Sequence, residues 1–361
     1  MTDRRWWQRK RLRWPIGIVV FFVAARIALP FVVEWKIDKE LGALDGYYGK
    51  INDVDIQLWR GGYVLEGIEI VKTGAGIPTP FFKSPRAEVS VQWRALFDGA
   101  IVADGSILEP QLNFVKGPTE AESQYGEGVD WQKEILSLVP LDINKFEVID
   151  GDFHYRDFHS DPPVNVYVQS FDAVLRNLSN VVDETEDLPA EFYGKGLILG
   201  SGGLTIDAKM DLLAPSPEFT LDLEIKTLKL TQLNPLLKAY VGIDAEAGLF
   251  SLYAEVHGTE NSLDGYAKPI LEGVEIHEPG ESGDFLDRAG DALVGAGLEI
   301  LENQPHDRIA TRVPISGSLE DIKTNPWVVV FGILRNAFIN VFTHGLGLNR
   351  SDDEGGKGAD E

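Results

Sequence analysis

The sequence predicts an α+β protein, mainly antiparallel β, in which a transmembrane helix precedes a β-rich body. Three observations support this prediction: an apolar run near the N-terminus, alternation of apolar and polar residues over the middle of the chain, and helical periodicity near the C-terminus. The chain has 361 residues, of which 44% are hydrophobic and 25% are charged. That composition is typical of a globular protein with a large core.

The apolar run, Ile16 to Val33, is long enough to cross a bilayer as a helix, which takes about 17 to 25 residues. Trp14 and Trp35 flank the run, and tryptophan is enriched at both interfaces of a membrane. We therefore predict a membrane anchor over residues 14–35. The apolar residues assigned to this anchor are Ile16, Val19, Phe22, Ile27 and Val33.

Cations precede the apolar run, and Asp3 is the single acid before it. The positive-inside rule keeps such a segment in the cytoplasm and places the rest of the chain on the other side of the membrane. We therefore predict a cytoplasmic basic N-terminus over residues 1–13. The cations that determine this topology are Arg9, Lys10, Arg11 and Arg13.

A cleaved signal peptide is the alternative to an anchor. Val23, Ala24 and Ala25 supply the small residues that a cleavage site needs. Arg26 and a further apolar stretch follow them, where a mature protein would begin. The pattern therefore favours an anchor that stays attached to the body.

Alternation with a period of two predicts strands over most of a body that we place at residues 36–280. Each of these strands has one apolar face, so the sheet must close on itself, be covered by another layer, or leave an apolar surface for another molecule. The clearest alternating segments are 51–58, 63–70, 87–93, 164–168, 219–225 and 250–256.

Helical segments are predicted among and after these strands. Residues 231–240 form a short helical segment between two predicted strands, and residues 284–301 place apolar side chains on one stripe. The second of these opens a C-terminal helical segment that we place at residues 281–345. Helices of this kind pack on a sheet.

The last predicted helix, Pro326 to His344, is apolar around most of its circumference. A second membrane span is possible, but Arg335, Asn336 and Asn340 would lie at its centre, where polar groups are costly in hydrocarbon. An amphipathic helix that plugs the sheet or lies on a membrane is therefore favoured. The acidic, glycine-rich tail at residues 346–361 is expected to be disordered.

Charge and cysteine content exclude several classes of protein. The formal net charge is -24 although the first 33 residues are basic, so the body is strongly acidic and would repel nucleic acid. The chain has no cysteine, which excludes disulfides, thiolate metal sites and a cysteine nucleophile. The expected partners therefore do not include DNA or RNA.

The sequence carries no familiar catalytic motif, and we predict neither an enzyme nor a bound cofactor. Its one cluster of acids and imidazoles contains Asp150, Asp152, His154 and Arg156. On a strand these residues would share a face and could ligate a metal with a distant partner. The solvated face of a strand has the same pattern, with Phe153 on the buried side, and this interpretation is favoured.

Three stretches carry a resemblance to a known family: Trp93 to Pro118, Asp130 to Phe158 and Val313 to Phe338. They resemble the AsmA-related envelope family, and more closely a branch of it defined as a domain of unknown function. The resemblance covers most of residues 15–345. It implies a single inner-membrane helix, a body in the periplasm of a Gram-negative bacterium, and an elongated, curved sheet with an apolar groove.

Large members of that family are similar to bridge-like lipid carriers, and some are linked to outer-membrane assembly and lipid homeostasis. This chain is shorter, which favours a partial groove over a bridge across the periplasm. We expect a protein that shields lipid acyl chains, with the inner membrane, phospholipid and other envelope proteins as partners. A structural scaffold of the envelope is the alternative. The candidate groove residues are Phe219, Leu221, Leu223, Ile225, Phe250 and Leu252.

The charge asymmetry yields a first testable prediction. A reporter enzyme that folds only in the periplasm should be active when it is fused after Glu361. The cations before the span hold the N-terminus in the cytoplasm, so the other end of a single-span chain lies in the periplasm. The paired control is a reporter that is active only in the cytoplasm, fused at the same position. Activity of the cytoplasmic reporter would contradict the single span or its orientation.

Overall fold

The computed structural model describes the residues 46–57, 61–92, 102–119, 122–125, 142–178, 189–211, 218–240, 242–259, 262–276, 299–300, 308–318 and scattered positions between 20 and 44. Strands make up most of this part of the chain. They are β1 (Tyr47–Lys50), β2 (Asp53–Gln57), β3 (Gly62–Lys72), β4 (Phe82–Val91), β5 (Val102–Leu108), β6 (Gln111–Lys116), β7 (Asp142–Asp157), β8 (Val164–Leu178), β9 (Ala190–Ile198), β10 (Gly202–Asp211), β11 (Glu218–Lys229), β12 (Ala245–Thr259), β13 (Ser262–Ile276), β14 (Glu299–Ile300) and β15 (Arg308–Ser318).

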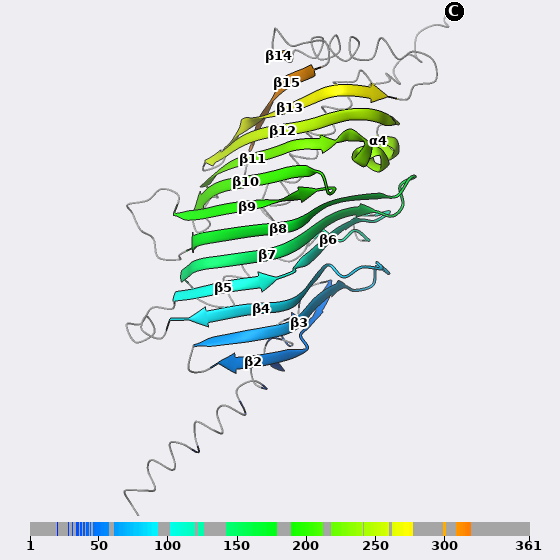
Figure 1. Cartoon of the computed structure of the whole chain (residues 1–361). Coiled ribbons are helices and arrows are strands. Elements are labelled where there is room, and N and C mark those ends of the chain that lie inside the picture. The colour runs from blue at the N-terminus through cyan, green and yellow to red at the C-terminus, as the bar shows by residue number, and fades with distance from the viewer. Residues whose placement is uncertain are drawn as a thin grey trace, which may run out of the picture.

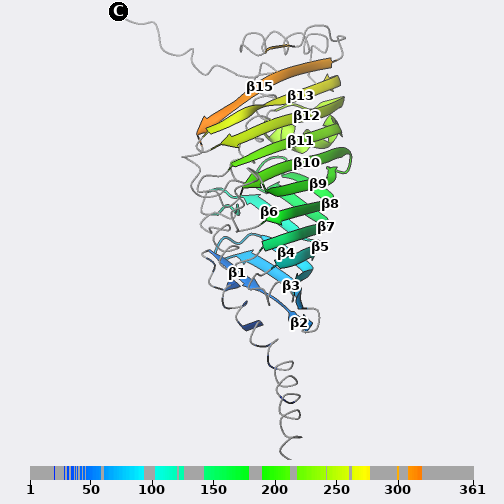
Figure 2. The same ribbon diagram turned by 90° about the vertical axis from the view of Figure 1, so that its left-hand side faces the viewer.

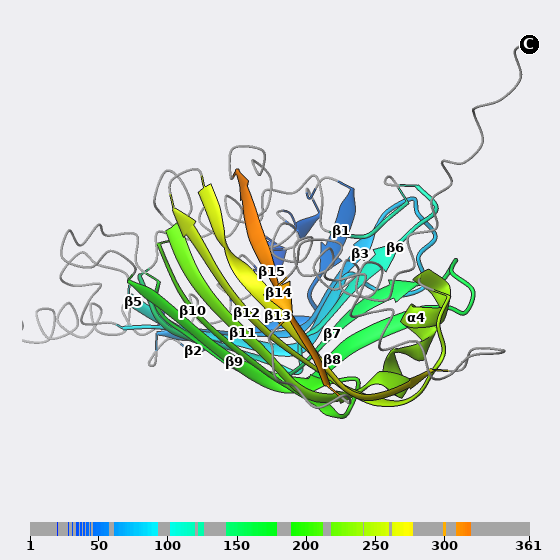
Figure 3. The ribbon, with the colours of Figure 1, turned by 90° about the horizontal axis from the view of Figure 1, so that it is seen from above.

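These strands form one 15-stranded sheet with the order β1-β3-β4-β5-β7-β8-β9-β10-β11-β12-β13-β15-β14, while β2 pairs with β3, and β6 with β4 and β7. The pairs are antiparallel except where β5 and β6 meet β7. The prediction of a mainly antiparallel body is therefore confirmed. Figures 1 and 2 show the strands stacked nearly in chain order, and Figure 3 shows that the sheet is curved.

Apolar residues lie opposite one another across the whole sheet, and residues that pair directly share one face. Two tracks of such residues cross the sheet, with one residue from each strand they meet. The Val54 track consists of Val54, Leu65, Ala87, Ile107, Val148, Ala173, Gly194, Ile206, Leu223, Ala254, Ala267 and Val313. The Ile56 track consists of Ile56, Tyr63, Val89, Gly105, Phe146, Leu175, Phe192, Ala208, Leu221, Val256, Gly265 and Ile315.

We call the face that carries both tracks the apolar face and the opposite one the polar face. The residues between the two tracks point to the polar face, because side chains alternate along a strand. Asp207, Asp222 and Glu255 follow one another there across β10, β11 and β12. Over β10, β11 and β12 the sheet is therefore one-sided, as the alternating sequence predicted, whereas on β3 the residue between the two tracks, Val64, is apolar and only 4% exposed.

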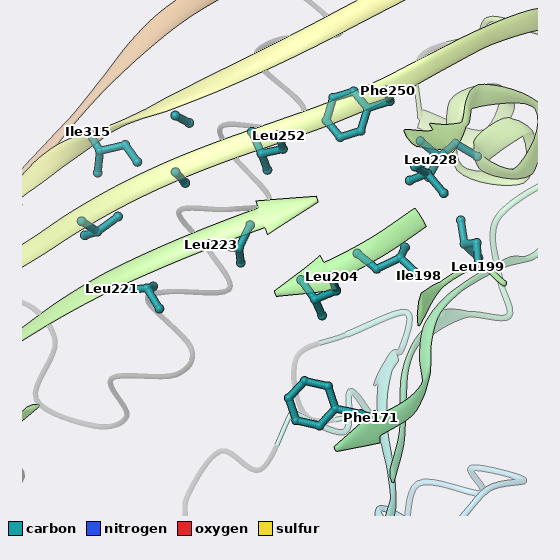
Figure 4. Packing of buried hydrophobic residues seen from close by; sticks show 14 of the residues in the cluster. Phe171, Ile198, Leu199, Leu204, Leu221, Leu223, Leu228, Phe250, Leu252 and Ile315 are labelled. Atoms are coloured by element: carbon teal, nitrogen blue, oxygen red, sulfur yellow. The ribbon is translucent and has the colours of Figure 1, made fainter. Parts of the chain in front are cut away.

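Most of the apolar face between β8 and β15 belongs to one hydrophobic cluster, which we call the long core. Ala267 is 0% exposed and Phe250 is 1% exposed. Figure 4 shows how Phe250 lies with Leu252, Leu223 and other side chains of this cluster. Gly194 is needed where Phe171 crosses β9, because a Cβ at Gly194 would lie 2.6 Å from the Phe171 ring. A smaller N-terminal core contains Ile51, Val54, Ile56 and Ile68.

The sheet continues past the boundary predicted at residue 280. β15 pairs with β13 along its length, and β14 pairs with β15. The helix predicted at 284–301 is therefore wrong at Glu299 and Ile300, where pairing with β15 overrides the helical periodicity. The predicted segment at 281–345 contains an eleven-residue strand. The helix predicted at Pro326–His344 and the tail at 346–361 lie outside the described residues.

The predicted short helix at 231–240 is confirmed as the 3-10 turn η1 (Leu230–Leu233) followed by α4 (Asn234–Tyr240). At the N-terminus, the described positions between 20 and 41 are helical, and Ile37 and Leu41 pack against the N-terminal core. Within the part of the chain that is described, no helix is long and apolar enough to span a membrane. The predicted anchor residues and the four topology-determining cations lie outside that part.

Two adjacent residues of β9 test the one-sided sheet. Ile198 is 8% exposed on the apolar face, while Leu197 is 39% exposed on the polar face. Ile198→Asp should lower the free energy of unfolding by about 3 kcal/mol or more, because it buries an unpaired carboxylate. Leu197→Asp should change it by no more than about 1 kcal/mol. Urea denaturation followed by tryptophan fluorescence measures both, and equal losses would contradict the assignment of the faces.

Candidate apolar binding face

The six candidate groove residues come together on one face of two neighbouring strands. Ile225 on β11 pairs with Leu252 on β12, and Leu223 pairs with Ala254. Leu221, Leu223 and Leu252 are 7%, 8% and 4% exposed, and all belong to the long core with Phe250. Phe219 and Ile225 are half-buried and pack against it. This part of the apolar face is therefore densely covered.

Coverage changes along the tracks. Leu65, Ala87, Ile107 and Val148, which carry the Val54 track over β3, β4, β5 and β7, are all half-buried. The Ile56 track is half-buried over the same strands, at Tyr63, Val89, Gly105 and Phe146. The sequence indicated which way such residues point, but no local signal distinguishes covered from uncovered positions. Sequence reasoning therefore missed this section as a candidate site.

The η1–α4 segment connects β11 to β12 and adds its leucines to the long core. Leu230, Leu233 and Leu237 are 1–2% exposed. The Asn234 side chain accepts a hydrogen bond from the Ala245 N–H at 2.9 Å and donates one to the Ala245 carbonyl at 2.9 Å. This pair of bonds closes the loop and fixes the start of α4 against the start of β12.

The far end of α4 is attached to β7 through a buried carboxylate. Asp157, which is 3% exposed, accepts a hydrogen bond of 2.6 Å from the Tyr240 hydroxyl. Lys116 Nζ lies 3.2 Å from the same carboxylate oxygen and 4.8 Å from the centre of the Tyr240 ring. The backbone N–H groups of His159 and Ser160 donate to the other carboxylate oxygen at 2.9 and 3.0 Å.

These contacts shift the pKa values of both partners. Burial alone would raise the pKa of the Asp157 carboxyl, but the hydrogen bonds from Tyr240 and His159 and the ammonium of Lys116 together hold it below its usual value. Burial and the carboxylate raise the pKa of the Tyr240 hydroxyl well above its usual value. Asp157 is therefore ionised and Tyr240 is neutral at pH 7, and the pair acts as a structural clasp.

The cluster of acids and imidazoles lies on β7, with Phe153 packed against the long core. His154 Nδ1 lies 3.0 Å from the Asn165 side-chain oxygen, and burial lowers the pKa of this imidazole. Arg156 donates to the Asn113 side chain at 3.2 Å. Among the residues that the structure describes, no group of His, Asp and Glu side chains is arranged to hold a metal ion.

No family model matches the chain, and no curated protein matches it significantly. The resemblance to the AsmA-related family therefore stays a prediction that rests on the three stretches quoted above. The apolar face itself carries the functional argument.

The clasp gives a prediction with a pH dependence. Tyr240→Phe should lower the free energy of unfolding at pH 7 by about 1 to 3 kcal/mol, because the buried carboxylate loses a donor. The pKa of Asp157 is lowered in the folded state, so its contribution is fully present above the ordinary pKa of about 3.9 and is lost as the pH falls below it. The deficit of the variant should therefore shrink below about pH 4.

Denaturation curves of the wild type and the variant between neutral and acidic pH measure this deficit. Tyr193→Phe is the control, because Tyr193 is 45% exposed on the polar face. A deficit that does not depend on pH would show that Tyr240 stabilises the fold through its ring alone.

Proposed function

We propose that this protein is an inner-membrane-anchored periplasmic protein that contributes to envelope or outer-membrane lipid homeostasis by shielding lipid acyl chains on its apolar face. One observation carries the proposal: two tracks of apolar residues cross the sheet from β2 to β15 without a charged side chain in either. At the usual strand spacing of about 4.8 Å, each track is roughly 50 Å long.

Such a face suits hydrocarbon more than any polar ligand. The Tyr63 hydroxyl is the only polar side-chain group in the two tracks. Each methylene group removed from water contributes about 0.8 kcal/mol, so an acyl chain needs no specific polar contact to bind. The tracks would bind lipids according to length and shape, with little dependence on the head group.

The N-terminal run and the acidic body support the location. The basic segment before Ile16 and the apolar run after it favour an anchored protein, and the resemblance to AsmA-related proteins favours the inner membrane of a Gram-negative bacterium. Ile37 and Leu41 pack against the N-terminal core, so the chain enters the sheet directly after the predicted anchor. The body would then face the periplasm, with the inner membrane and phospholipid as its partners.

A non-enzymatic scaffold of the envelope is the second candidate, and the burial of the long core favours it. Leu252, Ala254 and Val256 are 4%, 5% and 3% exposed, so other side chains of the chain itself cover them. Side chains so well covered act as the protein's own core. On this reading the apolar face holds the body together and the polar face binds other envelope proteins.

A lipid-removal experiment separates the two candidates. Vesicles that contain the full-length protein are mixed with donor vesicles whose fluorescent-chain phospholipid is quenched by a neighbouring dye. Ile107 is half-buried on the apolar face. Ile107→Asp should slow the rise in fluorescence by about tenfold, because it puts a carboxylate among the apolar tracks. The matched control, Leu197→Asp, puts the same charge on the polar face and should leave the rate unchanged.

Absence of a signal from the wild-type protein, where a known lipid carrier gives one, would contradict lipid shielding. A scaffold function would then replace lipid shielding as the proposed function.

A further inference from the structure

We infer that the acyl chain binds one particular section of the apolar face, centred on Val89, Ile107 and Phe146, and that the section from β10 to β13 is a permanent core. This inference rests on the proposed function and assigns the position of its ligand. The section lies on β4, β5 and β7, between the N-terminal core and the long core.

The first observation is that packing is interrupted at this section. The N-terminal core reaches Leu65 and Ala87, and the long core begins with Val148. Within the described part of the chain, Val89, Ile107 and Phe146 belong to neither cluster, although both tracks pass through them. The tracks are therefore continuous in register while the packing on top of them is not.

The second observation is exposure. Val89, Ile107 and Phe146 are half-buried, whereas the side chains of Leu221, Leu223, Ala254, Val256 and Ala267 are 0–8% exposed. A row of large apolar side chains in contact with water marks a binding surface when it is contiguous. A row that the protein already covers has no free area for a ligand. Leu175, Phe192 and Ile206 on β8, β9 and β10 are half-buried too, but they pack against the long core. The section at Val89, Ile107 and Phe146 is therefore the part of the tracks that an acyl chain can reach without displacing that core.

The shape and chemistry of this section fit a hydrocarbon chain. Gly105 lies between Val89 and Phe146 in the Ile56 track, and the Phe146 ring lies over it, since a Cβ there would be 2.7 Å from the ring. Between Val89 and Phe146 the Ile56 track therefore carries no polar side chain. From β4 to β7 the section spans two strand spacings, which is roughly 10 Å at the usual strand spacing.

The position of the section identifies a membrane lipid as the source of that chain. Ile37 and Leu41 follow the predicted anchor and pack in the same cluster as Leu65 and Ala87. Those two residues precede Ile107 in the Val54 track. Trp35 is 64% exposed, as an interfacial residue at the end of a span would be. The uncovered section therefore begins beside the segment that leaves the predicted membrane anchor.

Photo-crosslinking of the full-length protein tests this assignment. The protein is placed in vesicles of phosphatidylethanolamine and phosphatidylglycerol that carry a diazirine in one acyl chain, irradiated, digested and mapped by mass spectrometry. Adducts in the body should fall on β4, β5 and β7, at a yield about tenfold above those on β11 and β12, because the latter are covered. Peptides from residues 14–35 serve as the internal positive signal.

A pair of adjacent variants sharpens the test. Val89→Asp puts a charge on the section and should reduce the body adducts by about tenfold, whereas Ser90→Asp, at an exposed position on the polar face, should leave them within about twofold. Adducts spread equally over β11 and β12 would overturn the inference and leave the proposed function in place. Adducts confined to residues 14–35 would contradict both.

If Val89→Asp proves unstable in a parallel melting experiment, the adduct map of the unmodified chain decides the question by itself.

Discussion

Each strand that the two tracks cross must present the apolar residues of those tracks to the same face, and the rest of the structure depends on that constraint. Because side chains alternate along a strand, a slip of one residue in any pair would turn the apolar set of that strand to the polar face. The pairing of Leu221 with Val256, and of Leu223 with Ala254, shows how the register satisfies the constraint. Repeated across the sheet, it converts a local period of two into continuous tracks.

In the long strands, bulges keep the apolar residues on the apolar face. One extra residue enters β7 between Val148 and Gly151, and one enters β11 between Ile225 and Leu228. Asp150 and Thr227 take positive φ angles of 52° and 54° at these points. Each bulge returns the next apolar residue to the apolar face, and bulges also bend the strand that contains them. The curvature in Figure 3 is consistent with strands that bend in this way.

The clasp between Asp157 and Tyr240 serves a different purpose from the tracks. It joins β7 to the end of α4 across a long stretch of sequence, through a carboxylate that is almost completely buried. A buried carboxylate is tolerated only when its oxygens are paired, and here Lys116, Tyr240 and two backbone N–H groups pair them. Polar contacts of this kind have directional geometry, so they specify where α4 lies more sharply than its leucines do.

The sequence by itself determined the class of the body, the direction of its side chains and the helix at residues 231–240. These features depend on local periodicity: Phe219, Leu221 and Leu223 must share a face whatever lies above them. Only the tertiary structure decided which apolar residues are covered, because Leu223 and Val89 have the same local pattern and differ in what packs on them. It also decided that Glu299 and Ile300 are strand, because pairing with β15 outweighs the helical pattern. The hydrogen bond between Tyr240 and Asp157 could not be predicted, because the local sequence around either residue carries no signal for a contact between residues so far apart in the chain.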